Sequence, residues 1–125
     1  DRGELEEAVE AGRRAITLDP HLGDAYINLA AAEQERKNSQ TALRWIEALL
    51  AFAPQNAQAW ATKATLLKEA EHLPETLQAA EQAIGLAPAL ADAHYAHGSI
   101  LQALGRHAEA LTALQKAGEL PGVKA

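Results

Sequence analysis

Residues 57–90 read AQAWATKATLLKEAEHLPETLQAAEQAIGLAPAL, and the pattern of this stretch recurs on both sides of it. Pro20, Pro54 and Pro88 follow one another at intervals of 34 residues. Two further sets of residues align at the same interval. One set is aromatic or histidine and comprises Tyr26, Trp60 and His94. The other set is small and comprises Ala30, Ala64 and Gly98. An excess of alanine can align one set by chance, but it cannot also align the prolines and the aromatic residues. The chain therefore contains internal sequence repeats with a period of 34 residues.

The composition predicts that each repeat is helical. The 125 residues include 30 alanines and 18 leucines, which favour helices, and few β-branched residues. The three aligned prolines stop helices, Pro74 suits a first helical turn, and Ser39 is expected to cap the helix that follows it. We expect an all-α protein with seven helices, at residues 4–18, 23–36, 39–52, 57–70, 74–86, 91–104 and 107–119.

Position in the repeat predicts which side chains pack between helices. The small residues Ala30, Ala64 and Gly98 should let the two helices of a repeat approach each other closely. Larger residues should fill the remaining gaps, and we expect this of Tyr26, Trp60, Leu18, Phe52 and Leu86. Trp45 should lie toward the outer surface, where it either packs partly against a neighbour or contacts another domain.

The repeat resembles the tetratricopeptide repeat (TPR) family. The residues that support the resemblance are Tyr26, Leu29, Ala30, Ala42, Leu49 and Pro54, then Trp60, Ala64, Ala83 and Pro88, and then Gly98, Ala110 and Ala117. The resemblance implies a right-handed TPR solenoid of about seven antiparallel helices. It also implies one TPR domain over residues 1–125, with a half repeat at 1–22 and full repeats at 23–56, 57–90 and 91–122. Because the sequence has no methionine and begins at Asp1, we expect it to be a segment of a longer protein. Glu33 and Thr76 depart from the family pattern and suggest looser packing there.

The resemblance also implies a scaffold that binds a peptide or a partner's helix in a concave groove. The first helix of each repeat would line this groove, with Asp24, Ile27, Asn28, Ala31, Gln34, Gln58, Ala61, Thr65, Lys68, Asp92, Tyr95, Ser99 and Gln102. Its floor would be mildly apolar and its edges slightly acidic, so we expect a partner with apolar anchors and some basic residues. Tyr95 is the aromatic residue expected to anchor that partner. The carboxylate clamp of some family members is not expected, because only Asn28 fits its positions.

Charge and residue types argue against other functions. The net charge of −6 disfavours nucleic acid and anionic membranes, and no apolar run is long enough for membrane insertion. Cysteine is absent, which excludes a thiol nucleophile and cysteine-based zinc sites. His94 and His97 share a helix face, but no third ligand follows at motif spacing, so we expect packed histidines and no metal or cofactor. No catalytic motif is present, and we expect that the protein is not an enzyme.

Two other roles stay open. One alternative is the TPR arm of a multidomain enzyme, such as a glycosyltransferase or sulfotransferase. The other is a self-assembly scaffold, because the terminal helices should leave apolar edges exposed, including Leu104, Leu111 and Leu114. We expect a cytoplasmic protein, although the lack of cysteine fits the periplasm equally well.

Overall fold

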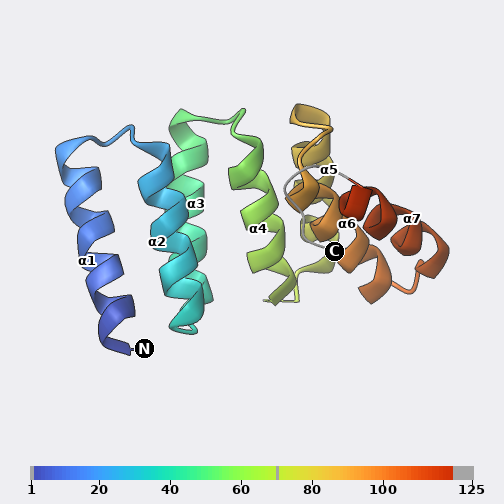
Figure 1. Ribbon diagram of the computed structural model, residues 1–125, viewed down its shortest axis with the longest axis horizontal. Coiled ribbons are helices and arrows are strands. Elements are labelled where there is room, and N and C mark those ends of the chain that lie inside the picture. Colours follow the sequence, from blue (N-terminus) through green and yellow to red (C-terminus); the bar gives the residue numbers. More distant parts are fainter. Residues whose placement is uncertain (1, 70, 120–125) are drawn as a thin grey trace. The chain divides into compact units, whose positions relative to one another are not determined.

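The computed structural model describes residues 2–69 and 71–119, and these residues form seven α-helices and no strand (Figure 1). The helices are α1 (Arg2–Leu18), α2 (Gly23–Glu35), α3 (Ser39–Phe52), α4 (Ala57–Glu69), α5 (Leu73–Leu86), α6 (Ala91–Ala103) and α7 (His107–Glu119). Every boundary lies within two residues of its predicted position, so the all-α prediction is confirmed. The end of the last predicted repeat, residues 120–122, lies outside the described residues.

The chain divides into two compact units, Asp1–Pro54 and Gln55–Ala125. In the first unit α2 packs against both α1 and α3. In the second unit α4 pairs with α5, α6 pairs with α7, and α6 also packs against α5 and α4. The first helices of two consecutive repeats, α4 and α6, therefore lie side by side in the second unit, which is the arrangement that a groove requires.

Each hairpin turns through one residue in the left-handed region. Lys37, Glu71 and Gly105 share one position of the repeat and have φ angles of 67°, 64° and 82°. The amide of the next residue donates to a carbonyl oxygen five residues earlier, as in a Schellman motif. These bonds run from Asn38 to Glu33 at 2.8 Å, from His72 to Leu67 at 3.0 Å and from Arg106 to Leu101 at 2.9 Å.

The predicted Ser39 cap is wrong. The helix α3 begins at Ser39, and the N-cap position belongs to Asn38, whose side chain makes no capping bond. The preceding Schellman turn through Lys37 fixes where α3 starts, so a side-chain cap is not needed to define this end.

Alanine makes up most of the buried side chains, and Ala30, Ala42 and Ala64 are fully buried. The close approach predicted for the small residues is confirmed at Gly98. A Cβ atom on Gly98 would lie 2.8 Å from Leu114 Cγ and 3.2 Å from the Ala110 carbonyl oxygen. Helices α6 and α7 thus touch at a distance that only glycine permits without a shift.

Several predictions about large side chains are wrong. Trp60 is only half-buried, with Lys63 Nζ 5.1 Å from its ring centroid. Leu18 is 87% exposed in the last turn of α1, whereas Phe52, 36% exposed, still packs edge-to-face against Tyr26, with 5.4 Å between the ring centroids. Tyr26, by contrast, is buried as predicted.

The positions with unusual residues pack tightly, contrary to the expectation of looser packing. Glu33 is 3% exposed and pairs with Arg36, with 2.9 Å between Glu33 Oε1 and Arg36 Nη1. Thr76 is 1% exposed and donates its hydroxyl proton to the His72 carbonyl oxygen at 2.9 Å. Trp45 is half-buried and packs against the cluster of Val9, Leu29 and Ala32. This agrees with the prediction that it packs partly against a neighbour.

Candidate functional site

The residues predicted to line a groove lie on the three expected helices. Five are on α2 in the first unit, where Asp24, Asn28 and Ala31 are exposed and Ile27 and Gln34 are half-buried. The other eight are on α4 and α6 in the second unit, and the structure brings most of these together: Gln58, Ala61, Thr65, Lys68, Asp92, Tyr95, Ser99 and Gln102.

Two side-chain contacts connect α4 and α6 across this face. Gln58 Nε2 donates to Asp92 Oδ2 at 3.2 Å. Further along the same pair of helices, the Lys68 ammonium group donates to the Ser99 hydroxyl oxygen. We call the surface formed by the predicted groove residues of α4 and α6 the α4–α6 face. The two contacts connect the helices near both ends of this face.

A pocket of about 240 Å³ opens on the α4–α6 face. Its lining comprises Ala64, Thr65, Lys68, Glu69, Tyr95, Ala96 and Ser99. The two alanines are buried and so provide an apolar floor, whereas hydroxyl groups, one ammonium and one carboxylate surround it. Tyr95 is 64% exposed, which leaves most of its ring available for contact.

Two alanines of α4, Ala61 and Ala64, are both buried. Ala61 is 2% exposed and packs in a core cluster with Ala83 and Ala93, and it is not among the residues that line the 240 Å³ pocket. Its small side chain lies where α6 covers α4. Ala64 was assigned only to helix packing, yet it also lines the pocket, because a buried alanine can serve both the core and a pocket floor.

The two histidines on α6 are half-buried, as predicted. His94 Nε2 lies 2.7 Å from the Pro88 carbonyl oxygen. Burial lowers the pKa of His97; Glu81 and Glu109 oppose this effect, and His94 and Arg106 reinforce it. In the part of the chain that is described, no group of three or more His, Asp or Glu side chains is placed to hold a metal ion.

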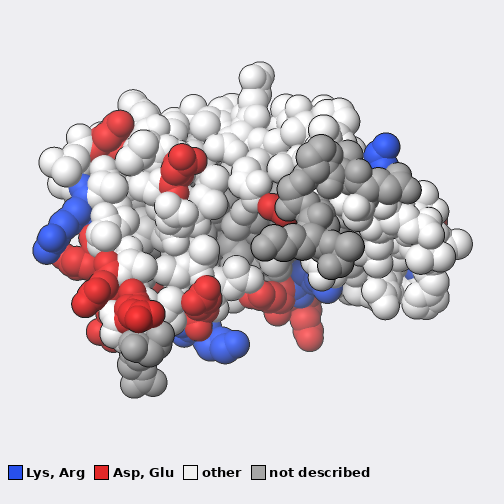
Figure 2. Space-filling view, viewed as in Figure 1, with Lys and Arg blue, Asp and Glu red and all other residues white. Residues whose placement is uncertain are grey.

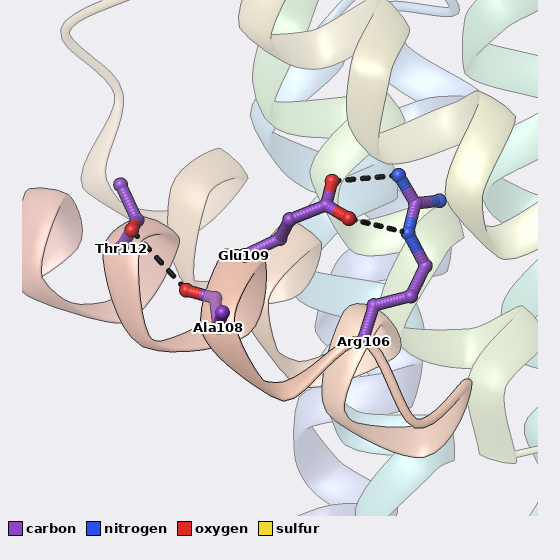
Figure 3. A network of polar contacts seen from close by, with 4 residues as sticks. All are labelled: Arg106, Ala108, Glu109 and Thr112. Atoms are coloured by element: carbon purple, nitrogen blue, oxygen red, sulfur yellow. Dashed lines mark hydrogen bonds and ion pairs between the residues drawn. The ribbon is translucent and has the colours of Figure 1, made fainter.

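An exposed ion pair lies at the start of α7 (Figure 3). Arg106 Nε and Nη2 donate to the two carboxylate oxygens of Glu109 at 2.9 and 2.6 Å. These hydrogen bonds lower the pKa of Glu109. The Glu109 carboxylate is therefore turned toward Arg106 and its charge is balanced locally.

Acidic side chains gather near the N-terminal end of α1, as Figure 2 shows at the lower left. The exposed residues Glu4, Glu6, Glu7 and Glu10 belong to this helix. Such a surface is unsuited to polyanionic partners. Of the helices described, none has the length and apolar character that crossing a bilayer requires.

Comparison with known proteins identifies the repeat. A family model described as tetratricopeptide repeat matches residues 1–66, and a second model of the same description matches residues 91–121. A search of curated proteins gave no match.

Similar solved structures include several of MamA. A crystal structure of MamA is 19% identical, with a TM-score of 0.79 over 96% of this chain and 70% of that chain. A second crystal structure of MamA is 23% identical, with a TM-score of 0.76 over 95% of this chain and 65% of that chain. A structure of MamA from residue 41 to its end, from Desulfovibrio magneticus RS-1, is 25% identical, with a TM-score of 0.78 over 94% of this chain and 67% of that chain.

The family assignment rests on the first of the two model matches, which spans more than half of the chain. The repeated helical hairpins and the similar fold of MamA agree with it. Proteins with this fold are typically non-catalytic scaffolds for contacts between proteins. The chain belongs to the tetratricopeptide repeat family.

Proposed function

We propose that this protein is a non-catalytic scaffold that binds a peptide or helix of a partner protein on the α4–α6 face. The observation that supports this most directly is Tyr95, which is 64% exposed beside a pocket with an apolar floor. A tyrosine offers a large contact area, few rotatable bonds and a hydroxyl group, so exposed tyrosines often act as binding anchors.

The residues around Tyr95 indicate what kind of segment would bind. An apolar side chain of the partner would rest on Ala64 and Ala96, while the hydroxyl groups of Thr65 and Ser99 meet polar groups of its backbone. The carboxylates of Glu69 and Asp92 on α4 and α6 favour basic residues near that apolar anchor.

The first unit offers a separate surface of the same kind. On α2 the exposed residues Asp24, Asn28 and Ala31 occupy the same repeat positions as the α4 and α6 residues. Ile27 and Gln34 are half-buried beside them. We therefore propose these five residues as a second binding surface, which belongs to the first unit alone.

The experiment is a pull-down with the immobilised chain, followed by calorimetry with each recovered partner. Tyr95→Ala should weaken binding by about 1–3 kcal/mol and leave the melting temperature nearly unchanged, because the ring is mostly exposed. Leu111→Ala is the matched control, since Leu111 is 59% exposed but lies on α7. Partners that bind Tyr95→Ala as tightly as the unaltered chain would contradict the proposal.

Self-association is a second candidate function, and exposed leucines support it. Leu111 on α7 is 59% exposed, and Leu104 is 39% exposed. An interface between copies would remove this apolar surface from water. Sedimentation velocity over a concentration series should then show oligomers that Leu111→Lys disrupts; a chain that stays monomeric at millimolar concentration would exclude this role.

A further inference from the structure

A second hollow in the second unit lies between α6 and α7 and has a volume of about 450 Å³. Its lining includes Ile84 from α5, His94, His97 and Leu101 from α6, and Ala113 and Lys116 from α7. We call it the α6–α7 hollow. It is lined by none of the residues around the Tyr95 pocket, and neither the family nor the repeat pattern assigns a role to it.

The first unit carries a tryptophan at the repeat position that Ala113 occupies in the second unit. Trp45 precedes Ala113 by two repeat lengths and therefore occupies the same position in its own hairpin. The indole of Trp45 packs against the buried cluster of Val9, Leu29 and Ala32, as Ile16 also does, and its ring centroid is 6.1 Å from that of Tyr26 in an edge-to-face arrangement.

The residues around Trp45 have counterparts around the hollow. Two repeat lengths after Ile16, Tyr26 and Leu29 come Ile84, His94 and His97, which all line the hollow. The surroundings of an indole are thus repeated in the second unit, but alanine stands at position 113 and supplies no ring. The hollow therefore lies beside the repeat position at which the equivalent hairpin carries a tryptophan.

The rim of the hollow also suits an aromatic ring. Two imidazole rings, His94 and His97, can make edge or stacked contacts with it. Glu109 lines the hollow, but its carboxylate is hydrogen-bonded to Arg106, whose positive charge balances it (Figure 3). Lys116 can lie over a ring in the way that Lys63 lies over Trp60, 5.1 Å from its centroid.

We propose that the α6–α7 hollow receives an aromatic side chain, tryptophan above all, from a partner polypeptide. This inference does not rest on the α4–α6 face, because the two sites share no lining residue. Tyr95→Ala should therefore leave binding in the hollow intact, which separates the failure of one proposal from the failure of the other.

The test uses two probes that differ in their side chain, N-acetyl-tryptophanamide and N-acetyl-leucinamide, titrated into the ¹⁵N-labelled chain. The tryptophan compound should give saturable shifts at the amides of His97, Thr112 and Ala113, with a Kd about tenfold lower than that of the leucine compound. Shifts that do not saturate, or that are equal for both probes, would overturn the proposal.

A variant that fills the hollow gives a second readout. In Ala113→Trp the new indole should occupy the site, abolish probe binding and raise the melting temperature by about 3–6 °C. Ala108→Trp is the matched control, because Ala108 is exposed on the same helix, and it should change neither quantity. If Ala113→Trp folds poorly, Ala113→Leu should still weaken probe binding; undiminished binding in either folded variant would place the probe elsewhere and refute the inference.

Discussion

The Tyr26 hydroxyl donates a hydrogen bond to the carbonyl oxygen of Pro20 at 2.8 Å. One side chain of the first helix in a repeat thus ties that helix to the turn before it. His94 and Pro88 stand at the same positions two repeats later, with 2.7 Å between His94 Nε2 and the Pro88 carbonyl oxygen. The prolines that align at 34-residue intervals therefore contact the aligned aromatic or histidine residues in two of the repeats.

We expect Tyr26→Phe to lower the free energy of unfolding by about 1 kcal/mol, because it removes this bond from a buried residue. Urea denaturation measures the change. Tyr95→Phe is the control and should have no measurable effect, since Tyr95 is mostly exposed. Equal losses in the two variants would show that the bond to Pro20 does not stabilise the fold.

Gly98→Ala should destabilise the chain by about 1–3 kcal/mol, because overpacking forces α6 and α7 apart. The added Cβ atom would lie 2.8 Å from Leu114 Cγ. Gly85→Ala makes the same change in a helix where a Cβ meets nothing within 4 Å. It should instead stabilise the chain by up to about 1 kcal/mol, so thermal unfolding should shift in opposite directions for the two variants.

The three hairpin turns predict a second pair of opposite effects. Gly105 has a φ of 82° and open space around it, so Gly105→Ala should cost about 1 kcal/mol through backbone strain alone. Lys37 adopts the same conformation, with a φ of 67°, and Lys37→Gly should recover up to about 1 kcal/mol. Denaturant midpoints for the two variants on either side of the unaltered chain would confirm this reading of the turns.

The ion pair between the buried Glu33 and the partly exposed Arg36 should respond differently to the loss of each partner. Arg36→Ala leaves a carboxylate that is 3% exposed without its cation and should cost about 2–4 kcal/mol. Glu33→Leu places the residue that the other repeats carry, Leu67 and Leu101, and should be neutral or stabilising by about 1–2 kcal/mol. Calorimetric unfolding that finds Glu33→Leu the more damaging change would contradict this account.

Stability should fall in mild acid because of His97. Burial lowers its pKa below the usual value of 6.5, so the unfolded chain takes up a proton at a higher pH than the folded chain does. The free energy of unfolding should therefore decline as the pH falls below about 6.5 and through the folded pKa. His97→Gln should flatten this decline between pH 7 and 5, whereas His107→Gln, at an exposed position, should preserve it.

The sequence was sufficient to predict the helices because local signals define their ends. Prolines stop the second helix of each repeat, and a left-handed residue ends the first helix at Lys37, Glu71 and Gly105. Only the last of these is glycine, and the first two turns were predicted from residues that follow them, Ser39 and Pro74.

The site was predictable in outline but not residue by residue. Repeat position predicted Tyr95 and Lys68, which both line the pocket on the α4–α6 face, whereas Ala61 is buried in a core cluster and does not line that pocket. Likewise Trp60 shares its repeat position with Tyr26, yet Tyr26 is buried and Trp60 is only half-buried. The burial of a side chain depends on the neighbouring residues that cover it. The repeat period gives the position of a residue in its helix but not the identity of those neighbours.

The predominance of alanine in the interior has a consequence for how this protein melts. A buried alanine removes little apolar surface from water, so unfolding exposes less such surface per residue than in a leucine-rich core. The heat-capacity change and the denaturant m-value both scale with that exposed surface. Its stability curve should accordingly be flat and its transitions broad, with the hairpins able to open one after another along the chain.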